Sequence, residues 1–137
     1  MAIEMINPEI LLRLVVAAVA GGLIGLERSA ANKPAGLRTL MLVGMGASLF
    51  TIISTTSSMD DPIKMLAGIV TGIGFLGAGT IFRAEDNVRG LTTAASMWTV
   101  AAIGVAVGLG QYAITIAATV LVILILQLGR IEFLREH

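Results

Sequence analysis

The sequence contains no cysteine, and its single histidine, His137, is the last residue. Disulfides, thiolate nucleophiles and cysteine metal sites are therefore excluded, and metal chemistry would have to use oxygen ligands. Neither a Gly-x-Ser-x-Gly pattern nor a Walker motif occurs, and the Gly-x-Gly-x-x-Gly pattern of residues 72–77 lies in an apolar run without the strand that a dinucleotide site requires. We therefore expect a protein that is not an enzyme and has no cofactor, with Mg²⁺ left as a ligand to consider and no metal-ligating residues assigned.

Charged residues are scarce as well. They make up 13% of the 137 residues, against about 25% in an average soluble domain, whereas 56% are hydrophobic. The mean hydropathy is +0.93, and no charged residue occurs from Leu91 to Gly129. Lipid must therefore be the solvent of most of the chain. The nine basic and nine acidic residues balance, which excludes a basic nucleic-acid surface.

Five segments approach the roughly 20 apolar residues that a helix needs to cross a bilayer core of about 30 Å. Two of them begin with Asn7-Pro8 and Asp61-Pro62, a helix cap followed by a proline. The glycines on either side of Leu109 divide the last apolar run, which as one helix would be about 57 Å long. We predict a single all-α integral membrane domain over residues 1–137, with transmembrane helices at about 8–26, 36–56, 62–82, 91–109 and 111–128.

Basic residues indicate the orientation, because Lys and Arg are enriched in short cytoplasmic loops. Only Arg13 and Lys64 fall on one side of the predicted bundle. Seven fall on the other side: Arg28, Lys33, Arg38, Arg83, Arg89, Arg130 and Arg135. This bias predicts an N-terminus outside the cell and a C-terminus in the cytoplasm. The alternative, four spans and one re-entrant glycine-rich segment, would separate the C-terminal arginines from the first loop.

An internal repeat is visible when residues 8–52 are aligned with residues 62–106 at a constant offset of 54. The helix-starting prolines then coincide, and so do two Gly-Leu-x-Thr steps, Gly36–Thr39 and Gly90–Thr93. Because the first and third spans run in the same direction, the pattern predicts a parallel repeat of two helices plus two, with the fifth helix as an extra element.

Small residues line most of the spans, and three Gly-x-x-x-Gly pairs occur in them. Such faces let helix backbones approach closely in lipid, either within one chain or between two copies. The third span holds more glycine than packing requires, so it is predicted to bend or unwind, and an ion or ligand site beside Gly74–Gly79 is the alternative. Trp98 lies away from the interfacial belt and is predicted to pack at a helix contact or to face a cavity. The helix-packing or cavity candidates are Gly21, Gly25, Gly68, Gly72, Gly74, Gly77, Gly79, Trp98, Gly104 and Gly108.

Polar residues gather at the ends that are predicted to be cytoplasmic. Glu27 and Arg38 lie at the margins of apolar helices, where an unpaired charge is expensive. If the repeat places both loops around one axis, these two residues, Asp86 and Arg89 would form one ion-paired cluster. The alternative is a solvated loop whose charges only set the topology. The candidates for a functional polar cluster are Glu27, Arg28, Arg38, Glu85, Asp86, Asn87, Arg89, Thr92 and Thr93.

Four segments carry a resemblance to a known family: Gly25–Arg28, Ala35–Thr39, Gly72–Ile81 and Asn87–Ala95. In this order they resemble the membrane domain of the MgtC/SapB family. The resemblance implies a multi-pass protein of the bacterial inner membrane. It further implies a link to magnesium homeostasis, because the MgtC branch is associated with magnesium limitation, acid stress and survival inside host cells. Members are thought to act on membrane energetics or on partner membrane proteins, whereas older descriptions call them magnesium transporters.

Virulence-related members of this family carry a soluble cytoplasmic domain after the last span. The present sequence ends eight residues after Gly129, so we expect the membrane domain without the C-terminal soluble domain. A virulence role is therefore not transferred to this chain.

The sequence favours a non-enzymatic regulatory or interaction module, homo-oligomeric with a dimer preferred, that contacts membrane lipid and other inner-membrane proteins. The alternative is a transporter or channel for Mg²⁺ or another cation. Mg²⁺ prefers octahedral oxygen coordination and sheds water reluctantly, yet only Glu27, at a helix end, offers a carboxylate within a predicted span. A structural lipid-packing protein without specific partners is a third interpretation.

Overall fold

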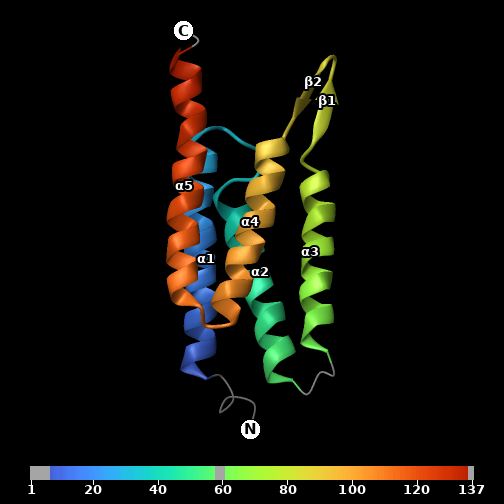
Figure 1. Ribbon diagram of the computed structural model, residues 1–137, viewed down its shortest axis with the longest axis vertical. Coiled ribbons are helices and arrows are strands. Elements are labelled where there is room, and N and C mark those ends of the chain that lie inside the picture. Colours follow the sequence, from blue (N-terminus) through green and yellow to red (C-terminus); the bar gives the residue numbers. More distant parts are fainter. Residues whose placement is uncertain (1–6, 58–60, 136–137) are drawn as a thin grey trace.

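A computed structural model describes residues 7–57 and 61–135, with side chains to residue 132, so that His137 lies outside it. Within these residues the chain forms five helices and one β-hairpin. They are α1 (Pro8–Ala30), α2 (Leu37–Thr56), α3 (Pro62–Ala78), β1 (Phe82–Ala84), β2 (Asn87–Arg89), α4 (Leu91–Gly108) and α5 (Tyr112–Arg135). Successive helices run in opposite directions, so α1 begins at one end of the bundle and α5 finishes at the other (Figure 1).

Four of the described helices are long and apolar enough to cross a membrane, namely α1, α2, α4 and Tyr112–Glu132 of α5. The fifth, α3, has 17 residues and is about 25 Å long at a rise of about 1.5 Å per residue. It stands beside the others as a fifth apolar helix (Figure 1). The predicted all-α membrane class is confirmed.

The caps form as the sequence predicts. The Asn7 side chain accepts a hydrogen bond from the backbone N–H of Glu9 at 3.0 Å, and Asp61 caps α3 in the same way. Gly36 and Gly90, which the repeat aligns, are the N-cap residues of α2 and α4. The paired helices of the proposed repeat also run in the same direction (Figure 1), although a short turn joins the first pair and a β-hairpin joins the second.

Three helices end at residues other than the ends of the predicted spans. The third span does not reach Phe82, because turn hydrogen bonds from Thr80 and Ile81 follow the end of α3 and Phe82 enters β1. The first and fifth helices instead extend past residues 26 and 128 to Ala30 and Arg135. Glu27, Arg28 and Arg130 therefore lie on helical backbone. The predicted unwinding does not occur between Pro62 and Ala78, where α3 is a continuous helix.

Helices α1, α2 and α4 form the centre of the bundle, α5 packs on α1 and α4, and α3 packs on α4 and α2. Glycine makes the central contacts close. A Cβ at Gly21 would overlap the carbonyl group of Leu40, one at Gly25 would lie 2.7 Å from the Leu37 Cα, and one at Gly104 would overlap the carbonyl oxygen of Gly44. The Gly-x-x-x-Gly pairs of α1 and α4 are thus used for packing within the chain.

The third Gly-x-x-x-Gly pair behaves differently. A Cβ at Gly68, Gly72 or Gly74 would meet no other atom within 4 Å, and in α3 only Ile73 and Gly77 are buried. An open apolar groove of about 510 Å³ runs between α2 and α3, lined in part by Gly46, Gly68 and Gly72. This face of α3 is therefore left open by the described residues of the chain.

Candidate functional site

The charged candidates lie at one end of the bundle, where α1 and α5 finish and α2 and α4 begin. We call it the basic end. The hairpin of β1 and β2 projects from this end beyond α3 and α4 (Figure 1). The structure thus brings the predicted loop residues to the same end, as the topology prediction requires.

Glu27 and Arg28 form a buried ion pair at the basic end. Arg28 Nε donates to Glu27 Oε2 at 2.5 Å, and each side chain is only 5% exposed. The second carboxylate oxygen, Oε1, lies 3.9 Å from Arg130 Nε on α5 and has no hydrogen-bond partner among the described residues. Two charges removed from water need such mutual compensation, because desolvation costs several kcal/mol per ion.

The turn between α1 and α2 follows this pair along the chain. The Leu37 backbone N–H donates to Ser29 Oγ at 2.9 Å, which satisfies one free donor at the start of α2. Asn32 adopts a left-handed φ of 55° within the turn, and Ala35 is buried. Arg38 is exposed at the start of α2 and lines an open polar depression together with Lys33.

All hairpin candidates are exposed: Glu85, Asp86, Asn87 and Arg89. The described ion pairs involve none of them, and none involves Arg38. The predicted cluster of Glu27, Arg38, Asp86 and Arg89 therefore does not form, and Glu27 pairs with its neighbour Arg28 instead. The sequence contained a signal for this pair, since both charges occupy the last turns of one apolar helix.

The remaining candidates fall into different environments. Thr92 is exposed, whereas Thr93 is buried. Gly77 faces Ala94 of α4, where an added Cβ would lie 3.5 Å from the Ala94 Cβ, and Gly79 lies in the turn that follows α3. Trp98, predicted to pack at a helix contact or to face a cavity, is instead 52% exposed on α4.

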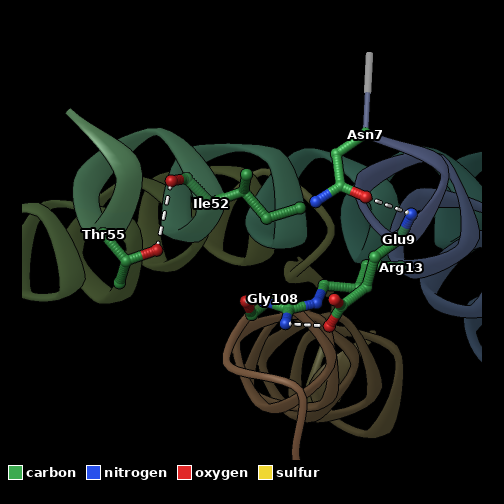
Figure 2. A network of polar contacts seen from close by, with 6 residues as sticks. All are labelled: Asn7, Glu9, Arg13, Ile52, Thr55 and Gly108. Carbon is green, nitrogen blue, oxygen red and sulfur yellow. Dashed lines mark hydrogen bonds and ion pairs between the residues drawn. The ribbon is translucent and has the colours of Figure 1, made fainter. Parts of the chain in front are cut away.

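Arg13, at the opposite end, links α1 to the end of α4, a contact that its place in the sequence does not predict. Its Nη1 donates to the carbonyl oxygen of Gly108 at 2.7 Å, and its Nη2 forms an ion pair with Glu9 (Figure 2). A Cβ at Gly110, which has a φ of +75°, would lie 3.2 Å from Arg13 Nη2. Arg13 thus holds the turn between α4 and α5 against α1.

Several buried hydroxyl groups donate to their own helices, whereas Ser48 Oγ has no hydrogen-bond partner among the described residues. Thr51 donates to the carbonyl oxygen of Ala47 at 2.8 Å, and Thr119 donates to that of Thr115 at 2.7 Å. Among the described residues no group of three or more His, Cys, Asp or Glu is placed to hold a metal ion. The polar interior therefore supports helix packing rather than a convergent ligand set.

The alternating apolar helices and the buried ion pair near one end define a multi-pass α-helical membrane protein. The family model described as the MgtC family matches residues 14–132. The chain belongs to the MgtC family, as the resemblance predicted.

Relatives share a large part of the sequence. The chain is 44% identical over 128 residues to the "Putative magnesium transporter YhiD" of Escherichia coli K12, covering 87% of this chain and 60% of that protein. It is 50% identical over 113 residues to the "Protein MgtC" of Salmonella typhimurium LT2, covering 82% and 49%. It is 41% identical over 117 residues to the "Protein SapB" of Bacillus subtilis 168, covering 78% and 50%.

The chain thus spans about half to three-fifths of the length of these relatives, 49% to 60%. None of these three protein names describes an enzyme. No solved structure gives a significant match.

Proposed function

We propose that this chain is a regulatory or interaction module of the bacterial inner membrane, linked to magnesium limitation and membrane energetics, that acts without enzymatic chemistry. It contacts other inner-membrane proteins through the basic end and works as a homo-oligomer, with a dimer preferred. The observation that carries the proposal is that the basic end holds both a buried ion pair and exposed arginines that are not ion-paired within the described residues.

Two of the charged residues at this end form an ion pair, and two others have no ion-pair partner among the described residues. Glu27 and Arg28 pair with each other in the interior through Glu27 Oε2, whereas Arg38 and Arg89 are exposed and take part in none of the described ion pairs. An arginine at the N-terminal end of a helix faces the positive end of the helix dipole, so each of these two needs an anion from elsewhere. A carboxylate of a partner protein would supply it at Arg38, and a carboxylate or a phosphate from outside the chain would supply it at Arg89.

A magnesium pathway is the rival function, favoured by the name of the Escherichia coli relative. A conduit for Mg²⁺ needs oxygen ligands along its length, because the ion gives up its water reluctantly. The interior carboxylate, Glu27, is already engaged by Arg28, and buried hydroxyls such as Thr51 and Thr119 donate to carbonyl groups of their own helices. These contacts favour the regulatory role over transport.

Complementation tests the regulatory role. A bacterial strain that lacks its own copy of this gene is grown at limiting Mg²⁺ with the parent chain or a variant. Arg38→Lys and Arg89→Lys should each lose most of the growth benefit, because lysine lacks the planar fork that binds a carboxylate in two places. Lys33→Arg, in the exposed turn between α1 and α2, is the matched control and should grow like the parent.

The same experiment can refute the proposal. If both arginine variants reach the membrane at the parent level and support growth equally well, the arginines only set the topology. Purified protein in vesicles gives the second measurement. A Mg²⁺ flux that Glu27→Ala or Asp86→Ala abolishes would establish transport in place of regulation.

A further inference from the structure

The hairpin of β1 and β2 has no cover from the described chain. Its strands pair antiparallel with Phe82 opposite Arg89 and Arg83 opposite Val88, and every residue from Ile81 to Arg89 is exposed. An isolated two-stranded hairpin is marginally stable in water. The hairpin also exposes apolar side chains, which is unfavourable in water, since Phe82 is 50% and Val88 53% exposed.

The two ends of the hairpin approach each other closely at its base. Gly90 has a φ of +89°, and a Cβ there would overlap the carbonyl oxygen of Thr80. Thr80 in turn donates from Oγ1 to the Gly77 carbonyl oxygen at 2.7 Å. These contacts join the two ends of the hairpin directly above α3 and α4, and the hairpin continues in their direction (Figure 1).

The chemistry of the hairpin changes along its length. Near the helices it presents two cross-strand pairs, Phe82 with Arg89 and Arg83 with Val88. At its turn it presents Glu85, which has a left-handed φ of 54°, and Asp86. The hairpin is therefore apolar and basic at its base and acidic at its tip.

This order matches the layers of a membrane surface. Helix α4 has 18 residues, about 27 Å, which is close to the hydrocarbon thickness of about 30 Å. A strand rises about 3.4 Å per residue, so Arg89 and Val88 stand about 3 and 7 Å above Gly90. The headgroup layer on each side is about 5–8 Å thick. The two cross-strand pairs that contain Arg83 and Arg89 fall within this headgroup layer, and the acidic turn extends beyond it.

Both guanidinium groups are free to bind an anion. Arg83 makes only a long contact from Nε to the Glu85 carbonyl oxygen at 3.4 Å, and Arg89 donates no side-chain hydrogen bond and forms no ion pair among the described residues. A guanidinium binds phosphate through two parallel hydrogen bonds. Anionic lipids attract basic residues close to the membrane surface.

We propose that the hairpin Phe82–Arg89 stands in the headgroup layer and binds the phosphate groups of anionic phospholipids through Arg83 and Arg89. Phe82 and Val88 contact the upper ends of the acyl chains, and Glu85 and Asp86 remain in water. The inference goes beyond the proposed function and does not depend on it, because a lipid contact of this kind would exist whatever the module regulates.

The absence of cysteine from the sequence allows a direct test with single labels. An environment-sensitive fluorophore is attached to V88C, or to D86C as the matched control at the turn, in protein reconstituted into vesicles of phosphatidylglycerol and phosphatidylcholine. We expect aqueous iodide to quench the V88C label several-fold less than the D86C label. Lipids spin-labelled near the headgroup should quench the V88C label more strongly.

Two further variants test the arginines. R83Q/R89Q should raise iodide quenching at V88C to the level at D86C, whereas K33Q, which removes a charge from the neighbouring turn, should leave it unchanged. If R83Q/R89Q fails to insert, labelled V88C protein that keeps both arginines is compared in vesicles with and without phosphatidylglycerol. Removal of phosphatidylglycerol should raise iodide quenching at V88C.

Three results would overturn the proposal. Equal iodide quenching at V88C and D86C would place the whole hairpin in water. Protection of V88C that survives both R83Q/R89Q and the removal of phosphatidylglycerol would exclude phosphate binding. Protection that disappears when the protein is diluted with excess lipid would identify a second copy of the chain as the occupant.

Discussion

Glu27 and Arg28 are consecutive in the sequence and pair with each other inside the bundle, at 2.5 Å between Oε2 and Nε. The ion pair therefore belongs to a single helix end, and its burial depends on the helices that surround it. Arg130 of α5 is the nearest further cation, 3.9 Å from Oε1. Breaking the pair would leave one charge buried without compensation.

Glu27→Ala is expected to lower the free energy of unfolding by about 3–5 kcal/mol, the usual cost of removing one partner from a buried pair. Denaturation of the purified protein in detergent micelles, followed by circular dichroism, measures it. Glu132→Ala, at an exposed position of α5, is the control and should change stability little. A Glu27→Ala protein as stable as the control would show that Arg28 finds another partner or reaches water.

Gly21→Ala should destabilise the bundle by about 1–3 kcal/mol, because the added methyl group overlaps the backbone of α2 and overpacking has this cost. Gly72→Ala, where a Cβ would meet open space, should be neutral or slightly stabilising. Thermal unfolding of the two variants compares them. Equal destabilisation would indicate that another molecule covers α3, and light scattering on the same samples would show whether it is a second copy.

Gly90→Ala should disrupt the base of the hairpin. A side chain pays about 1–2 kcal/mol for left-handed backbone, and here it would also overlap the Thr80 carbonyl oxygen. We expect faster proteolysis within residues 81–89 and a lower unfolding temperature. Gly129→Ala, with nothing within 4 Å of the added Cβ, is the control, and identical behaviour of both variants would contradict the geometry at Gly90.

Labelling of introduced cysteines tests the orientation. A cysteine at Gln111 should react with an impermeant reagent added outside the cell, and cysteines at Asn32 and Asn87 only after the membrane is opened. All three positions are exposed. The sequence also predicts Ser58 outside and His137 inside, two positions beyond the described residues. Labelling of Asn32 from outside would reverse the predicted topology.

The sequence by itself determined the features that depend on local pattern. The length and apolarity of the runs predict the number of helices, and the caps at Asn7 and Asp61 predict where two of them begin, because hydropathy and capping act between residues close along the chain. Gly36 and Gly90 were likewise aligned by the repeat before either was known to be an N-cap residue.

Helix ends were harder to predict. Hydropathy ends the numbered spans just before Glu27 and Arg130, because a charge lowers local hydropathy, but a charge paired at the membrane boundary is compatible with helical backbone. The hairpin was missed because its strands have only three residues each, too few for alternation to show as a pattern.

The tertiary structure alone decided which charges pair and which glycines are covered. Arg13 and Gly108 are 95 residues apart and meet because α1 and α4 lie side by side, a contact that no spacing in the sequence encodes. Gly21 and Gly72 look equivalent in their Gly-x-x-x-Gly pairs, yet one touches the backbone of α2 and the other faces open space. The physical reason is that close helix approach depends on the rotation and position of both helices, and these are set by the packing of the whole bundle.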